Sequence, residues 1–220
     1  MNKTDVIKDM FRIRPKNNLN VVDFFSGCGG LSLGFKLAGY NTLLAIDNDR
    51  DSLETINANQ CVSETLNLDL FDDHSLDKII QKIDKEINIV IAGPPCQGFS
   101  LTGPRKLNDK RNKLYLSVIK YIQNVKPKAF LIENVKGMAS LYNGRVMENI
   151  KEELASLGYI VETKILNAKY YGVPQSRERL FYVGMKDKKF KFPDPLFNDN
   201  EAITCGDAIS DLPSLETTDC

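Results

Sequence analysis

One cysteine in the middle of the chain carries the clearest chemical signal. Cys96 stands in the stretch GPPCQGFS directly after two prolines, and the only histidine, His74, lies far upstream. Three interpretations compete: a buried structural thiol, a redox thiol, and a nucleophile at the end of a sheet strand. No CxxC partner supports redox chemistry, and two prolines restrict the backbone that would aim a nucleophile. The stretch therefore favours a nucleophile, since a thiolate needs only nearby positive charge to form.

A glycine-rich turn, SGCGG at residues 26–30, follows the first predicted strand. A doubly wound sheet presents backbone N–H groups to a ligand at this place, although a tight turn alone would also require glycine. Asp47 ends the next strand, where an acid commonly holds ribose hydroxyl groups. Ser32 stands where the dinucleotide fingerprint needs a third glycine. The turn therefore suits an adenosine cofactor without a pyrophosphate, such as S-adenosylmethionine, and Asp69 could reach its adenine amino group.

Helices and strands must position these residues, and the hydrophobic pattern of the sequence predicts where those elements lie. Aliphatic runs alternate with amphipathic stretches of helical length, which predicts an α/β fold with a mostly parallel sheet. Leu31, Phe35 and Ala38 can share one face of the first helix, and Gly39 supplies its end. The last two strands are separated by a short loop and are expected to be antiparallel. We predict strands over 20–25, 42–47, 61–69, 87–93, 128–135, 160–168 and 179–185, and helices over 31–40, 49–60, 74–86, 112–125 and 145–159.

Composition narrows the classes of protein. The 220 residues include 29 acidic and 29 basic side chains, and this balance argues against a chain built mainly to bind a polyanion. No apolar run reaches the roughly 20 residues of a membrane span and no signal peptide is evident, so we expect a cytoplasmic location. The five cysteines lack zinc spacing, so we expect neither metal nor disulfides, and interpret Cys28 and Cys61 as structural.

Six stretches together carry a resemblance: DFFSGCGG, AIDND, NLDLFD, GPPCQGFS, ENVKGM and QSRERLFYVG. In this order and spacing they resemble the N-terminal catalytic region of the cytosine-5 DNA methyltransferase family, from about Asn20 to Gly184. The resemblance implies a Rossmann-like S-adenosylmethionine-dependent methyltransferase fold, a mostly parallel doubly wound sheet with an antiparallel strand near the C-terminal end. It also implies methyl transfer from S-adenosylmethionine, leaving S-adenosylhomocysteine, to C5 of cytosine in DNA, as in bacterial restriction-modification in the cytosol or nucleoid.

Roles for single residues also follow from the resemblance. Cys96 would add to C6 of a flipped-out cytosine, and Glu133 would hydrogen-bond its N3 and amine. Arg177 and Arg179 would support the base and the Glu133 carboxylate; alone, Glu133 could cap a strand and the arginines could be a solvated edge. The implied DNA contacts are Gln97, Ser100, Arg105 and Arg111. The implied cofactor contacts are Phe25, Ser26, Gly27, Cys28, Gly29, Gly30, Leu31, Asp47, Asn48, Asp69, Leu70, Pro94 and Leu114.

The sequence departs from the family pattern at its end. The family continues into a target-recognition region and two further motifs, whereas residues 192–220 carry three prolines, much acid and little periodicity. We expect an N-terminal extension over 1–19, a catalytic domain over 20–191 and an irregular tail over 192–220. Recognition would then come from a missing segment or a second polypeptide. Asp47 and Asn48 replace a glutamate and a bulkier residue common in the family, which predicts modest cofactor affinity.

Three other functions stay open at this point. The family's tRNA-methylating branch shares all six stretches, and a test of transfer to tRNA against duplex DNA would separate the two. A cofactor-binding subunit without catalysis is disfavoured by the presence of both Cys96 and Glu133. A nicotinamide oxidoreductase is disfavoured by Ser32 in the glycine fingerprint.

Overall fold

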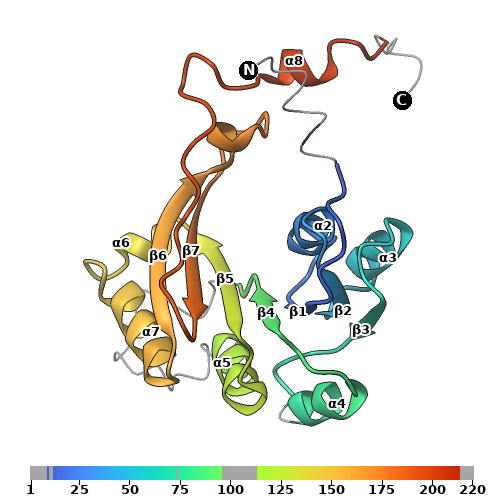
Figure 1. The fold of residues 1–220 in the computed structure, drawn as a ribbon, viewed down its shortest axis with the longest axis vertical. Helices are drawn as coiled ribbons and strands as arrows, with labels where there is room; N and C mark the ends of the chain where they lie inside the picture. Colours follow the sequence, from blue (N-terminus) through green and yellow to red (C-terminus); the bar gives the residue numbers. More distant parts are fainter. Residues whose placement is uncertain (1–8, 10–11, 73, 96–112, 214–220) are drawn as a thin grey trace.

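The computed structural model describes residues 9, 12–72, 74–95 and 113–213. Within them, seven strands form one sheet in the order β3-β2-β1-β4-β5-β7-β6 (Figure 1). The first five strands are parallel, and β7 is antiparallel to both of its neighbours. The predicted fold class is confirmed. The strands are β1 (Asn20–Phe24), β2 (Asn41–Asp47), β3 (Glu64–Asn67), β4 (Ile89–Ala92), β5 (Ala129–Val135), β6 (Ile160–Asn167) and β7 (Glu178–Met185).

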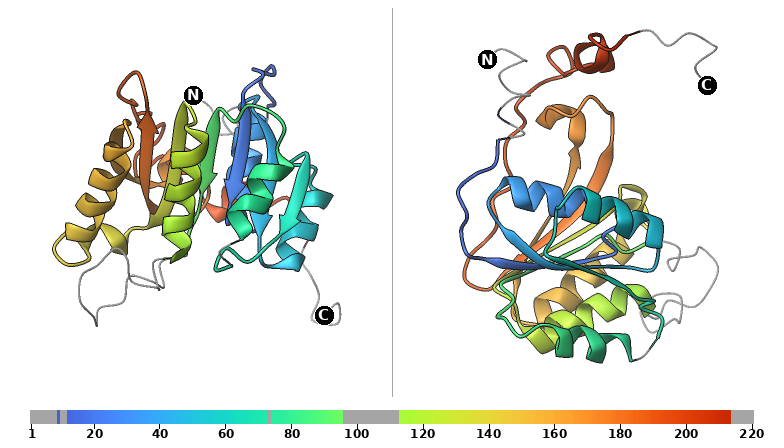
Figure 2. Two further views of the ribbon diagram at one scale, coloured as in Figure 1. Left: turned by 90° about the horizontal axis from the view of Figure 1, so that it is seen from below. Right: turned by 90° about the vertical axis from the view of Figure 1, so that its right-hand side faces the viewer.

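Helices cover the two faces of the sheet, as the edge-on view in Figure 2 shows. One face carries α2 (Gly30–Leu37) and α3 (Arg50–Ala58) over the early strands. The other face carries α4 (Ser75–Lys82), α5 (Lys113–Val125) and α7 (Arg145–Ser156), whose apolar side chains join those of the strands in the main core. The helices and strands of these three layers match the predicted ones within a few residues. The remaining short helices are α6 (Gly137–Ser140), η3 (Ala168–Tyr171) and α8 (Cys205–Ile209).

The two cysteines interpreted as structural lie in different environments. Cys61 is buried in a small cluster with Ala45, Leu53 and Ile56, which confirms its interpretation. Cys28 is exposed on the glycine turn, and its Sγ lies 3.8 Å from the Ser52 hydroxyl. The structural interpretation of Cys28 is therefore wrong, because its side chain is exposed while its neighbours Ser26 and Gly29 are buried.

The first helix buries a different side from the one predicted. Ser32 is the buried residue of α2, whereas Leu31 and Phe35 are half-buried and Ala38 is exposed beyond the end of the helix. The predicted stop is confirmed: Gly39 has a φ of +87°, and a Cβ there would collide with the Pro15 carbonyl. The hydrogen bond from the Ser32 hydroxyl to Asp23 on β1 therefore determines which side of α2 faces the sheet.

The C-terminal segment is more ordered than the predicted irregular tail. It contains α8, whose start has a capping box in which Thr204 accepts a hydrogen bond from the Asp207 N–H, at 3.1 Å. Phe197 and Ile203 in the same segment are buried. The short α6 was also missed. The domain boundaries stay a prediction.

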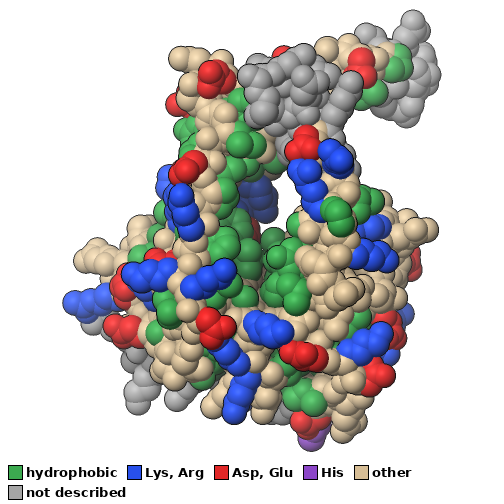
Figure 3. Space-filling view, in the orientation of Figure 1, with side chains coloured by type: hydrophobic (Ala, Val, Ile, Leu, Met, Phe, Trp, Pro, Cys, Tyr) green, Lys and Arg blue, Asp and Glu red, His purple; other side chains and the backbone are tan. Residues whose placement is uncertain are grey.

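One part of the sheet has no helix over it among the described residues. Side chains of β5 alternate, and those facing away from α5 and α7, such as Leu131 and Val135, are half-buried or exposed. The space-filling view shows the surface hollowed between the β6–β7 arm and α2, with hydrophobic side chains inside (Figure 3). Within the described part of the chain, no helix is long and apolar enough to cross a membrane; the expected location stays a prediction.

Candidate functional site

The carboxyl ends of four neighbouring strands meet around a pocket of about 70 Å³. Ligands of open α/β sheets bind at this edge, where the strand order reverses, and here the reversal lies between β1 and β4. The walls mix apolar side chains with two carboxylates. They are Phe25, Asp47, Asn48, Leu68, Asp69, Leu70, Phe71, Pro95 and Leu114.

The pocket brings together six of the thirteen residues predicted to hold the cofactor: Phe25, Asp47, Asn48, Asp69, Leu70 and Leu114. Pro95, instead of the predicted Pro94, lies on its wall, because Pro94 is buried and turned toward β5. Sequence reasoning also missed Leu68 and Phe71, which flank the predicted pair in NLDLFD. The other predicted residues, Ser26, Gly27, Cys28, Gly29, Gly30 and Leu31, form the turn and helix start beside the pocket without lining it.

Asp47 holds the glycine turn against the end of β2. Its Oδ2 accepts a hydrogen bond from the Gly27 N–H at 2.8 Å, and its Oδ1 accepts one from the Asp49 N–H at 3.0 Å. Each carboxylate oxygen keeps a further lone pair for a ligand hydroxyl. The acid therefore has a structural bond and free acceptor capacity at the pocket.

The turn itself has an unusual backbone. Phe25 has a φ of +56°, in the left-handed region that costs an ordinary residue roughly 1–2 kcal/mol. Such residues cluster at functional sites, where the surrounding structure maintains the strain. The strained Phe25 places its side chain on the pocket wall, where it can contact a flat ligand ring.

Gly29 is the position in this turn at which a side chain is least tolerated. Its φ is +89°, and an added Cβ would collide with the side chain of Ile56. We expect Gly29→Ala to lower the free energy of unfolding by about 2 kcal/mol or more, from backbone strain and overpacking. Gly34→Ala is the control, because Gly34 is helical with open space around it, and this change should add about 0.5–1 kcal/mol. Urea denaturation measures the free energy of unfolding of both variants. A change of the same sign in both would contradict the conclusion that Gly29 cannot accept a side chain.

A partly buried ion pair lies on the other side of the site from the pocket. The Arg179 Nε on β7 lies 2.8 Å from the Glu133 Oε1 on β5, and their side chains are 25% and 22% exposed. A Cβ built on Gly93 would lie 3.8 Å from the Glu133 Oε2, so this carboxylate sits beside the start of the GPPCQGFS loop. Arg177 is exposed, and within the described residues Arg179 makes the ion pair with Glu133.

Asn134 is a further residue of the site that sequence reasoning missed. It is buried, its Nδ2 donates to the Pro94 carbonyl at 3.1 Å, and its Oδ1 accepts from the Val135 N–H at 2.8 Å. The bond ties β5 to the loop that follows β4. The sequence did contain a signal for it. In AFLIENV, Asn134 falls on the same alternating positions as Phe130 and Ile132, so it is expected to be buried and hydrogen-bonded.

Five predicted residues lie outside the described part of the chain. They are the nucleophile and the four proposed DNA contacts, and their roles stay predictions. They are Cys96, Gln97, Ser100, Arg105 and Arg111.

The described walls fit the expected cofactor, S-adenosylmethionine. Phe25, Leu70 and Leu114 offer apolar surface to an adenine ring. Asp69 lies on the same wall, with its Oδ1 accepting the Phe71 N–H at 2.9 Å and its other oxygen available. Two carboxylates would repel a pyrophosphate but favour a sulfonium cation. Because the pocket is small, it fits the ring end of the cofactor and leaves the rest beside the glycine turn.

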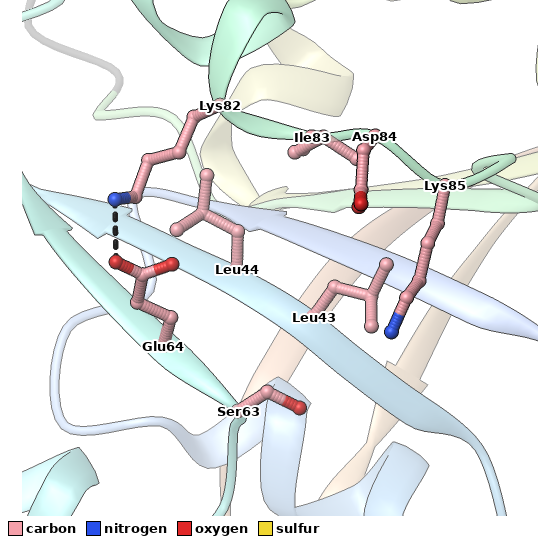
Figure 4. Close-up of a pocket in the computed structure, with 8 residues that line it drawn as sticks. All are labelled: Leu43, Leu44, Ser63, Glu64, Lys82, Ile83, Asp84 and Lys85. Carbon is pink, nitrogen blue, oxygen red and sulfur yellow. Dashed lines mark ion pairs between the residues drawn. The ribbon is translucent and has the colours of Figure 1, made fainter.

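A larger pocket, of about 260 Å³, lies near the amino-terminal parts of β2 and β3 (Figure 4). Lys82 and Glu64 form an ion pair across its rim. None of the predicted site residues lines it, and its charged residues are exposed. Volume alone therefore does not make it the better candidate. Its lining consists of Leu43, Leu44, Ser63, Glu64, Lys82, Ile83, Asp84 and Lys85.

Known proteins match most of this chain. A family model described as C-5 cytosine-specific DNA methylase matches residues 19–219. The Type II methyltransferase M.DdeI of Desulfomicrobium norvegicum is 39% identical over 207 residues, covering 90% of this chain and 49% of that protein. The Type II methyltransferase M.BspRI of Lysinibacillus sphaericus is 37% identical over 237 residues, covering 95% of this chain and 56% of that protein.

A solved structure shares the fold. It is described as a DNA modification methyltransferase encoded within a prophage of E. coli, and it matches with a TM-score of 0.70 and 32% identity. The match covers 90% of this chain and 56% of that one. This chain thus spans about half the length of the relatives that it matches.

Proposed function

Because this chain belongs to the C-5 cytosine-specific DNA methylase family, we propose that it carries the methyl-transfer site of a DNA cytosine-5 methyltransferase. One observation carries the proposal. The pocket that fits the ring end of the cofactor and the Glu133–Arg179 pair lie on either side of the start of the GPPCQGFS loop. A cofactor and a base held there would lie on either side of the strand end that leads into this loop.

The cofactor of this family is S-adenosylmethionine, which when bound supplies a methyl group on an electrophilic sulfonium. Phe25 and Leu114 would hold its adenine between apolar surfaces, and Asp69 would accept from the adenine amine. Asp47 would accept from the ribose hydroxyls with the lone pairs not used by Gly27 and Asp49.

The chain's own residues would activate the cytosine. The Cys96 thiolate adds to C6, while Glu133 as the acid donates a proton to N3, so that C5 becomes the nucleophilic carbon of an enamine. After C5 has taken the methyl group, its proton passes to solvent, the thiolate leaves C6, and N3 returns its proton. Because C6 is stacked inside duplex DNA, the base must first be flipped out. Arg179 would hold the Glu133 side chain in place, through the ion pair when Glu133 is charged and by donating a hydrogen bond to the carbonyl oxygen when Glu133 carries the proton.

Choice of a DNA target belongs to a separate part of the enzyme in this proposal. The chain matches about half of each relative's length, and its six motif stretches account for chemistry and cofactor. We propose that target recognition is supplied from outside these 220 residues, by a further segment of the protein or by a second polypeptide. The part of the sheet beside β5 that no described helix covers offers a surface for it.

The experiment is methyl transfer from labelled S-adenosylmethionine to mixed-sequence duplex DNA and, separately, to tRNA. The chain is assayed alone and with the polypeptide encoded immediately downstream. Transfer to DNA only in the mixture supports the whole proposal, and transfer by the chain alone supports the chemistry but contradicts the separate recognition part. Transfer to tRNA and not to DNA, or no transfer in any tube, would overturn the proposed function.

A further inference from the structure

A buried carboxyl group lies directly beneath the glycine turn and is not used in the chemistry above. Asp23 on β1 is 0% exposed, and its Oδ2 accepts a hydrogen bond from the Ser32 hydroxyl on α2 at 2.6 Å. Ser32 is also 0% exposed. The other oxygen, Oδ1, makes no hydrogen bond of good geometry with the described residues, although the Ser32 N–H also lies near enough to the carboxylate to lower its pKa. A half-satisfied buried carboxyl is an expensive feature that needs a reason.

This carboxyl works against stability at neutral pH. Burial raises the pKa of Asp23 to about 7, the hydrogen bond from Ser32 lowers it, and the charge of Asp47 raises it again. An acid with a raised folded-state pKa favours folding most at low pH and loses that contribution as the pH rises toward 7. The sheet neighbours of Asp23, Ala45 and Ile91, are uncharged and offer no compensating partner. The pair is therefore retained at a cost to the fold.

The position of the Asp23–Ser32 pair indicates a role in holding the glycine turn. Asp23 precedes the turn and Ser32 follows it, so their hydrogen bond spans the segment that contains Phe25, Gly27 and Gly29. The same segment is tied from the side by the hydrogen bond between Gly27 and Asp47. Two bonds thus fix the turn, one from β1 to α2 and one from β2.

We propose that Asp23 and Ser32 are a positioning pair, which sets the turn and the start of α2 for cofactor binding without contacting the cofactor. The inference rests on the proposed function of the pocket as a cofactor site. Neither residue lines the pocket, and both lie where the strand and the helix enter the turn. Their effect on binding must therefore pass through the backbone of the turn.

The test separates positioning from folding with an apolar replacement. In the double variant Asp23→Leu/Ser32→Ala, both polar partners are removed while the shape is nearly kept, a change that is often neutral or stabilising. We expect its melting temperature at pH 8 to equal or exceed that of the natural chain. We expect its Kd for S-adenosylhomocysteine, measured by calorimetry, to rise at least tenfold, because a turn displaced by a fraction of an ångström loses its contacts.

Two further variants serve as controls. Asp23→Asn keeps an acceptor for Ser32 and removes the charge, so it should bind within about twofold of the natural chain and be more stable at pH 8. Ile79→Val removes one methyl group from the core on the opposite face, so it should melt earlier with no change in Kd. A positioning role predicts that Asp23→Asn restores cofactor binding. It also predicts that Ile79→Val, which only lowers stability, leaves the Kd unchanged.

The results test two proposals separately: the positioning role of Asp23 and Ser32, and the cofactor site itself. A double variant that binds S-adenosylhomocysteine as tightly as the natural chain would overturn the positioning role. If the double variant fails to fold, Ser32→Ala alone takes its place, with an expected weakening of about fivefold or more, and unchanged binding again overturns the inference. A folded natural chain that does not bind S-adenosylhomocysteine at all would instead overturn the proposed cofactor site.

Discussion

Replacing Cys96 with alanine is expected to abolish methyl transfer to DNA, with a loss on the order of 10⁴-fold or more. The thiolate is the group that converts an aromatic C5 into a nucleophile. The described thiol nearest to the site, Cys28, lies on the glycine turn at the proposed cofactor end and is not expected to replace Cys96. Cofactor binding should be unchanged, because the described pocket walls are formed by other residues. The assay is labelled methyl transfer, in whichever preparation of the chain is active.

A second measurement tests the covalent bond itself. The natural chain should form a denaturation-resistant adduct with DNA containing 5-fluorocytosine, and Cys96→Ala should form none. Cys205→Ala is the matched control, since Cys205 is an exposed thiol on α8 that does not line the pocket. An alanine variant of Cys96 with more than a few per cent of natural activity would show that the reaction does not pass through this thiol.

Most of the fold could be predicted because its signals are local. Buried parallel strands such as IVIA in β4 are continuous apolar runs, and helices such as α7 end at a glycine. The short α8 also had a local signal, the sequence TCGD, which matches a capping box between Thr204 and Asp207. It was missed because the surrounding prolines and acids indicate irregular structure.

What could not be predicted depends on contacts between distant polar residues. A hydrophobic pattern treats Ser32 as solvent-exposed, so it placed the buried face of α2 on apolar residues. In the structure Ser32 turns inward because Asp23, nine residues earlier, accepts its hydrogen bond. Asn134 was missed for the same reason, since its partner is a backbone carbonyl in the loop that follows β4.

The arginine pair shows how a strand boundary decides a role. Residues two apart on one strand point to the same side, so Arg177 and Arg179 could both have reached Glu133. The strand β7 begins at Glu178, which leaves Arg177 outside the ladder with an exposed side chain. The predicted strand, 179–185, also begins after Arg177, whereas the resemblance gave a role to both arginines, so a strand boundary carries information that the motif alone does not.

Glu133→Gln is expected to reduce methyl transfer by about 10²–10⁴-fold, the usual contribution of a positioned acid or base. Glutamine keeps the shape of the side chain but cannot donate a carboxylic proton to N3, so C6 is no longer activated toward the thiol. Loss of the ion pair with Arg179 should cost at most about 1 kcal/mol of stability, because both side chains are partly exposed to solvent. The effect should therefore appear in activity and leave cofactor binding and folding nearly unchanged.

The neighbouring strand offers a matched control for this change. Glu178 lies one residue before Arg179 and pairs with Lys136 at 2.7 Å, and its side chain is 42% exposed. Glu178→Gln removes the same charge from the same edge of the sheet, but at a surface pair that does not face the loop. It should keep activity within about twofold, since exposed pairs contribute little. Equal losses in the two variants would mean that the charge of this edge, and not a proton held by Glu133, supports the reaction.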